Sequence, residues 1–196
     1  MALVVHDFRV YHELVPFLEE HDLPVLALAP GDHIPPSVKV LLDGPPADDR
    51  SVKLPIGDPE ETLVATRAAL LGHPPGAPPF RRAVIGVDPG DVIGLAVLAD
   101  DQVLVIGEER EPAAVAARVR SWCSVLAASA WAVHIGDGAR RVANAVLDQL
   151  AFELPDAEVV LVPEHATTPY AVATKSRHTD AAIRIALREP VAGTGP

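Results

Sequence analysis

The stretch Val84-Ile-Gly-Val-Asp-Pro-Gly-Asp-Val-Ile-Gly-Leu-Ala-Val-Leu-Ala-Asp100 decides the fold. An apolar run ends in Asp88, Pro89-Gly90 interrupt it, and Gly94 opens a second apolar run. This pattern predicts a β-hairpin whose first strand is buried. A carboxylate at the end of a buried strand is costly unless water, a hydrogen bond or a cation satisfies it. The pattern therefore indicates a metal-dependent phosphoryl-transfer site that begins at Asp88.

Strands and helices alternate after this hairpin. The predicted elements are Ala83–Val87, Gly94–Ala99 and Gln102–Ile106 as strands, a helix over 112–126, a strand at Trp131–Ile135, a helix over 140–153, a strand at Glu158–Val162 and a helix over 178–188. The order βββαβαβα predicts an α/β, ribonuclease-H-like domain with a mixed five-stranded sheet and flanking helices. We expect this domain to span residues 80–190, followed by a flexible tail at 191–196.

A small α/β domain of unknown role is expected to precede it, over residues 1–71. Its predicted strands and helices are Ala2–Val5, Val10–Glu20, Pro24–Ala29, Val38–Leu42 and Pro59–Leu71. This segment has no Gly-rich phosphate loop, so the sequence does not indicate a nucleotide site there. Gly72–Pro79 contains four prolines and two glycines in eight residues and is therefore predicted to be a linker.

The composition limits the classes of function. The formal net charge is −11, and residues 1–80 hold 12 acidic against 5 basic side chains, which argues against nucleic-acid binding through a broadly basic surface. The single cysteine, Cys123, excludes an intrachain disulfide. No apolar run approaches the length of a membrane span, and no secretory signal is visible. We therefore expect a cytoplasmic protein without a membrane partner.

Four acidic residues stand at predicted strand ends or on the last helix: Asp88, Asp137, Glu164 and Asp180. Strand ends at one edge of a largely parallel sheet converge, so these carboxylates could hold two divalent cations that activate water and stabilise a leaving oxygen. Structural explanations remain open for all four, although Asp88 is the hardest to explain in this way. Asp137 suits a turn between glycines, Glu164 suits a cap, and Asp180 suits a helix start or a pair with Arg184.

Four segments resemble, in order, motifs of the RuvC-type Holliday-junction resolvases and the related YqgF nucleases. They are Gly86-Val-Asp-Pro-Gly90 with Gly94-Leu-Ala-Val97, Ile135-Gly-Asp-Gly138, Pro163-Glu-His-Ala-Thr-Thr168 and His178-Thr-Asp-Ala-Ala-Ile-Arg-Ile-Ala-Leu187. The resemblance covers about residues 81–190. It implies that Asp88, Glu164 and Asp180 are catalytic metal ligands, with Asp137 as a further candidate, and that the cofactor is Mg²⁺ or Mn²⁺.

The chain also departs from the patterns of these families. The turn after Asp88 is one residue shorter than in the resolvases and carries Asp91, His165 replaces an arginine, and Ile183 stands where a second helix acid is expected. Five basic residues are predicted to contact phosphates, although a solvated, salt-bridged helix face explains them equally well. These residues are Arg140, Arg141, Lys175, Arg177 and Arg184.

The leading hypothesis is a Mg²⁺- or Mn²⁺-dependent endonuclease that hydrolyses phosphodiester bonds in branched DNA or in RNA. The alternative is a catalytically weak ribonuclease-H-like binding or scaffold protein in nucleic-acid metabolism, which the acidic composition favours. An actin-like ATPase or sugar kinase also opens with Gly-x-Asp-x-Gly, but needs further phosphate loops. A junction resolvase is expected to be a two-fold homodimer, whereas an RNA-processing enzyme can be monomeric.

Overall fold

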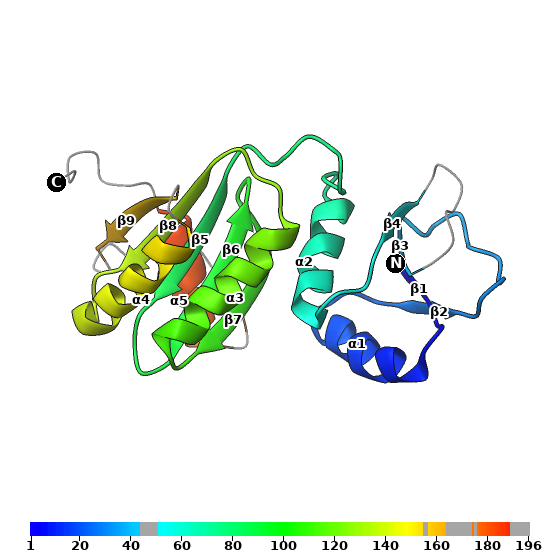
Figure 1. The fold of residues 1–196 in the computed structure, drawn as a ribbon, viewed down its shortest axis with the longest axis horizontal. Helices are drawn as coiled ribbons and strands as arrows, with labels where there is room; N and C mark the ends of the chain where they lie inside the picture. The colour runs from blue at the N-terminus through cyan, green and yellow to red at the C-terminus, as the bar shows by residue number, and fades with distance from the viewer. Residues whose placement is uncertain (44–50, 155–156, 164–173, 175, 189–196) are drawn as a thin grey trace. The chain divides into compact units, whose positions relative to one another are not determined.

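The computed structural model describes residues 1–43, 51–154, 157–163, 174 and 176–188. These residues form an α/β protein with a four-stranded parallel sheet, a five-stranded mixed sheet and five helices (Figure 1). The chain divides into two compact units, unit 1 (Met1–Pro78) and unit 2 (Pro79–Pro196). The predicted fold class is confirmed: a mixed five-stranded α/β sheet with flanking helices follows a smaller α/β unit.

Unit 1 alternates short strands and helices. In chain order they are β1 (Ala2–Val4), α1 (Phe8–Glu20), β2 (Leu26–Leu28), β3 (Val40–Leu42), β4 (Val52–Leu54) and α2 (Pro59–Leu70). All neighbouring strands are parallel, in the order β2-β1-β3-β4. The chain moves to one side of β1 to form β2 and to the other side to form β3. This reversal places diverging loops at the carboxyl ends of β1 and β3.

Both helices of unit 1 begin at an aspartate cap. The side chain of Asp7 accepts a hydrogen bond from Arg9 N, and that of Asp58 accepts one from Glu60 N. Each satisfies a backbone amide that has no partner inside the helix. The sequence analysis missed β4, because its three residues include the exposed Lys53 and give no clear periodicity.

Unit 2 contains the hairpin strands quoted above. Its elements are β5 (Ala83–Asp88), β6 (Ile93–Ala99), β7 (Gln102–Glu109), α3 (Pro112–Val125), β8 (Trp131–Gly136), α4 (Arg140–Glu153), β9 (Glu158–Val162) and α5 (Arg177–Ala186). The strand order is β7-β6-β5-β8-β9. Strand β6 is antiparallel to β5 and β7, whereas β8 is parallel to β5 and β9.

Helices cover both faces of the unit 2 sheet (Figure 1). Helices α3 and α4 lie on one face, where α3 buries Val115, Val119 and Trp122. Helix α5 packs on the other face, against β5 and β6 above all. Its Ala182, Ile183 and Ala186 join a buried apolar cluster with sheet residues. The buried strand β5 therefore delivers Asp88 to an edge of a sheet that is covered on both sides.

No helix within the described ranges is both long and apolar enough to cross a lipid bilayer.

Candidate functional site

Two of the predicted acidic residues of unit 2, Asp88 and Asp137, lie at the same edge of the sheet. Asp88 is the last residue of β5, and Asp137 directly follows β8. These strands are parallel, with Val87 opposite Ile135, so both aspartates lie at the same edge of the sheet. Asp137 N also donates to Val162 O, at 3.1 Å, which ties this edge to β9.

The start of α5 lies against the end of β5. His178 Nδ1 is 3.6 Å from Asp88 Oδ2, and both side chains are about four-fifths buried. Asp180 is engaged elsewhere, because its Oδ1 accepts from Thr174 N at 2.7 Å. Glu164 lies outside the described residues. In the part of the chain that the structure describes, no three His, Cys, Asp or Glu side chains form a group that could hold a metal. The metal-ligand roles of these residues, and the Mg²⁺ or Mn²⁺ cofactor, stay predictions.

The predicted phosphate-contacting residues are spread over two helices. Arg140 and Arg141 open α4 and are exposed, Arg177 opens α5 and is exposed, and Arg184 is half-buried on α5. Lys175 lies outside the described residues. Nothing tests nucleic-acid binding or a homodimer, so both stay predictions.

Two of the three glycines of the opening motif, Gly86 and Gly94, have a packing role. A Cβ on Gly86 would lie 2.0 Å from Ala182 O, and one on Gly94 would lie 2.2 Å from His178 O. Both contacts are with the backbone of α5, so the helix sits directly on these glycines. Close packing of a helix on a hairpin therefore explains why residues 86 and 94 are glycines.

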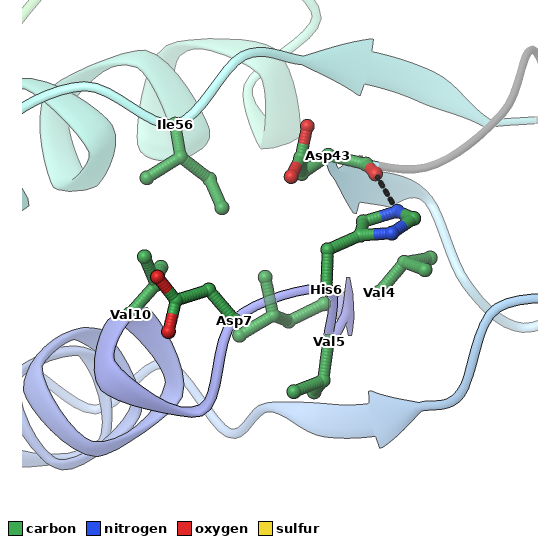
Figure 2. A pocket seen from close by; sticks show the side chains of 8 residues that line it. Val4, Val5, His6, Asp7, Val10, Asp43 and Ile56 are labelled. Carbon is green, nitrogen blue, oxygen red and sulfur yellow. Dashed lines mark hydrogen bonds between the residues drawn. The ribbon is translucent and has the colours of Figure 1, made fainter.

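A second group of polar residues lies in unit 1, at the carboxyl ends of β1 and β3. His6 and Asp7 follow β1, and Asp43 follows β3. Together with apolar side chains of β1, α1 and the segment after β4 they line a small, partly open pocket (Figure 2). The pocket is formed by Leu3, Val4, Val5, His6, Asp7, Val10, Asp43 and Ile56.

Hydrogen bonds fix two polar residues of this pocket. His6 Nε2 donates to the backbone carbonyl of Asp43 at 3.2 Å, and Figure 2 shows this link between the two strand ends. Asp7 is the cap of α1 and is held by Arg9 N at 2.8 Å. Asp43 is exposed and has a φ of 51°, a left-handed conformation that aspartate and asparagine tolerate better than most residues. Asp43 is thus exposed to solvent at the carboxyl end of β3.

A signal for this site was present in the sequence. Val40-Leu41-Leu42 is a short apolar run that is directly followed by Asp43, a shorter version of the pattern that drew attention to Asp88. Unit 1 lacks a Gly-rich phosphate loop, and on that ground no site was predicted there. That criterion tests for nucleotide binding and says nothing about a reactive carboxylate.

Comparison with known families gives a match in unit 1. A family model described as a response regulator receiver-like domain matches residues 1–71. No curated protein matches the chain. The matched segment covers β1 through α2 and includes His6, Asp7 and Asp43.

This finding corrects the functional expectation. The assignment of the chain to the RuvC-type and YqgF nucleases was wrong, because the family that matches is receiver-like, and a receiver-like domain points to signalling. The predicted endonuclease activity was therefore also wrong, and so was the alternative prediction of a scaffold in nucleic-acid metabolism. In the first of the four motifs, two glycines are accounted for by helix packing. The N-terminal unit, for which no role was predicted, is similar over residues 1–71 to a response regulator receiver-like domain.

Proposed function

We propose that this protein acts in signal transduction, and that unit 1 is a receiver-like regulatory module whose input is a phosphoryl group placed on Asp43. The observation that carries the proposal is the receiver-like match over residues 1–71, which includes an exposed aspartate at the carboxyl end of β3. The parallel order β2-β1-β3-β4 supports it, because ligands of open α/β sheets bind where the strand order reverses.

The chemistry needs only a carboxylate nucleophile and a phosphoryl donor. A carboxylate oxygen of Asp43 attacks the phosphorus of the donor, and the bond between phosphorus and the leaving group breaks. The leaving group departs with that electron pair, and the product is an acyl phosphate. The exposure of Asp43 allows a donor to approach.

The charged groups around Asp43 would couple its phosphorylation to a change in the conformation of unit 1. A phosphoryl group brings more negative charge than the single charge of the carboxylate it replaces. Asp43 shares its pocket with Asp7 and Val10, at the start of α1. A helix N-terminus favours negative charge, whereas the carboxylate of Asp7 repels it. The new charge is therefore expected to displace Asp7 or the His6–Asp43 link and so move the first turn of α1.

The experiment treats the full-length protein with acetyl phosphate and records its intact mass, once with Mg²⁺ and once with a chelator. We expect a mass gain of one phosphoryl group, removed by hydroxylamine as an acyl phosphate should be, and absent in Asp43→Asn. Asparagine keeps the tolerance for positive φ and removes the nucleophile. The chelator arm shows separately whether a divalent cation assists the reaction.

The matched control is Asp22→Asn. Asp22 is also in unit 1, also has a positive φ of 59°, and lies outside the pocket. We expect this variant to be labelled like the wild type. Absence of labelling in the wild type, or equal labelling of Asp43→Asn, would overturn the proposal.

A further inference from the structure

Asp43 is held through both polar groups of its backbone. Its N–H donates to the carbonyl of Leu54 in β4 at 3.2 Å, and its own carbonyl accepts from His6 Nε2, also at 3.2 Å. The first bond extends the pairing of β3 with β4, whereas the second comes from a side chain that follows β1. Figure 2 shows the imidazole on the carbonyl side of Asp43 and the carboxylate on the other side. The imidazole therefore restrains the backbone of Asp43 without occupying its carboxylate.

The bond from His6 acts on a strained backbone. Asp43 has a φ of 51°, in the left-handed region, which aspartate tolerates better than most residues but still at a cost. A change of φ to the right-handed or extended region would turn the carbonyl away from the His6 ring. It would also turn the Cα–Cβ bond of Asp43, and with it the carboxylate. The bond from His6 therefore favours one direction of the carboxylate over the others.

The backbone that carries the imidazole is itself anchored on both sides of His6. Val5 N donates to Leu28 O of β2 at 2.8 Å, and Asp7 caps α1 through Arg9 N. A carbonyl can only accept, so Nε2 must carry a proton in the bond to Asp43, and both the neutral Nε2–H tautomer and the imidazolium provide one. The link therefore does not depend on the charge of the ring.

We propose that His6 is a positioning residue for the phosphorylation of Asp43, a role that rests on the function proposed above. His6 holds the backbone of Asp43 so that the carboxylate is directed toward the incoming phosphoryl donor, and it takes no part in bond making. The net contribution of one hydrogen bond shifts the balance between two conformations by about three- to tenfold. Loss of the bond is therefore expected to slow phosphorylation by a similar factor.

The test compares the initial rate of phosphorylation by acetyl phosphate, measured as intact mass in the full chain, between the wild type and three variants. His6→Leu removes the donor and keeps a side chain of comparable size, so its rate should be about three- to tenfold lower. His6→Gln keeps an N–H donor on a side chain of similar length and should restore most of the rate. His12→Leu removes an exposed histidine of α1 that is outside the set of residues lining the pocket, and should react like the wild type.

The backbone of Asp43 is followed without any phosphoryl donor by the three-bond coupling between its amide and α protons, which reports φ. We expect the coupling in the wild type and in His6→Gln to fit the left-handed φ, and the coupling in His6→Leu to move away from it. Amide hydrogen exchange of α2 should be the same in all variants, because His6 does not hold this helix in place.

The outcomes separate this role from the function on which it rests. Absence of labelling in the wild type would overturn the phosphorylation of Asp43, and the role of His6 in that reaction with it. A labelled wild type together with an equal rate in His6→Leu would overturn the positioning role alone. A His6→Gln variant as slow as His6→Leu would do the same, since the donor would then not be what matters.

Discussion

Replacing Gly86 by alanine tests how α5 is seated on the sheet. The added Cβ would lie 2.0 Å from Ala182 O and 2.8 Å from the Cβ of Ala186. Real Cβ atoms essentially never come within 3.0 Å of such atoms, so α5 must move by about 1 Å or more. Overpacking of a core typically costs about 1–3 kcal/mol. Because the obstacle is backbone rather than a flexible side chain, we expect a loss of about 3 kcal/mol in the free energy of unfolding of unit 2.

Urea unfolding followed by tryptophan fluorescence measures this loss. The chain contains two tryptophans, Trp122 and Trp131, and both are in unit 2, so the signal reports on that unit. The control is Gly107→Ala in β7, where the new Cβ would meet the end of the Arg118 side chain at 3.0 Å. That side chain can move, so the control should cost less than about 1 kcal/mol. If Gly86→Ala were as stable as the control, the packing explanation of the motif would be refuted.

Three more substitutions or reactions follow from the structure. Burial raises the pKa of Cys123 to about 12, so at about pH 8 a disulfide reagent should label the native protein about a thousandfold more slowly than the urea-unfolded chain. Equal rates would contradict this. Asp101 has a φ of 66° in the turn between β6 and β7, a conformation that glycine adopts without strain. Asp101→Gly should therefore raise the free energy of unfolding, measured in urea, by about 0.5–1 kcal/mol. A lower free energy of unfolding would show that the backbone at Asp101 is not strained. Arg67 Nη2 donates to His21 O at 2.7 Å and so joins α2 to the end of α1. Arg67→Ala should therefore lower the free energy of unfolding of unit 1 by about 1–3 kcal/mol and speed amide hydrogen exchange in α1. Unchanged exchange would show that this hydrogen bond contributes nothing to stability.

The strands and helices of unit 2 could be predicted because they are long and strongly patterned. Strand β5 is a continuous apolar run, as expected for a strand covered on both faces, and β6 follows it after Pro89-Gly90. The three-residue strand β4 could not be predicted in the same way, since three residues cannot establish a period of two.

The function could not be read from the same motif. A glycine needed for a turn, a glycine needed for close packing and a glycine beside a catalytic aspartate look alike in a single sequence. The position of α5 on Gly86 and Gly94 separates these meanings, and this contact joins residues about 90 positions apart. The pair His6 and Asp43 is likewise separated by 37 residues, and the parallel pairing of β1 and β3 brings them together.

The central claim is that unit 1 receives a signal at Asp43, and amide chemical-shift mapping on the full chain tests it most directly. The spectrum is recorded before and after addition of acetyl phosphate, for the wild type and for Asp43→Asn. We expect the largest shifts at Val5, His6, Asp43 and the first turn of α1 in the wild type, and none of these in Asp43→Asn. Unchanged shifts around this pocket in the wild type, or the same shifts in both proteins, would contradict the account.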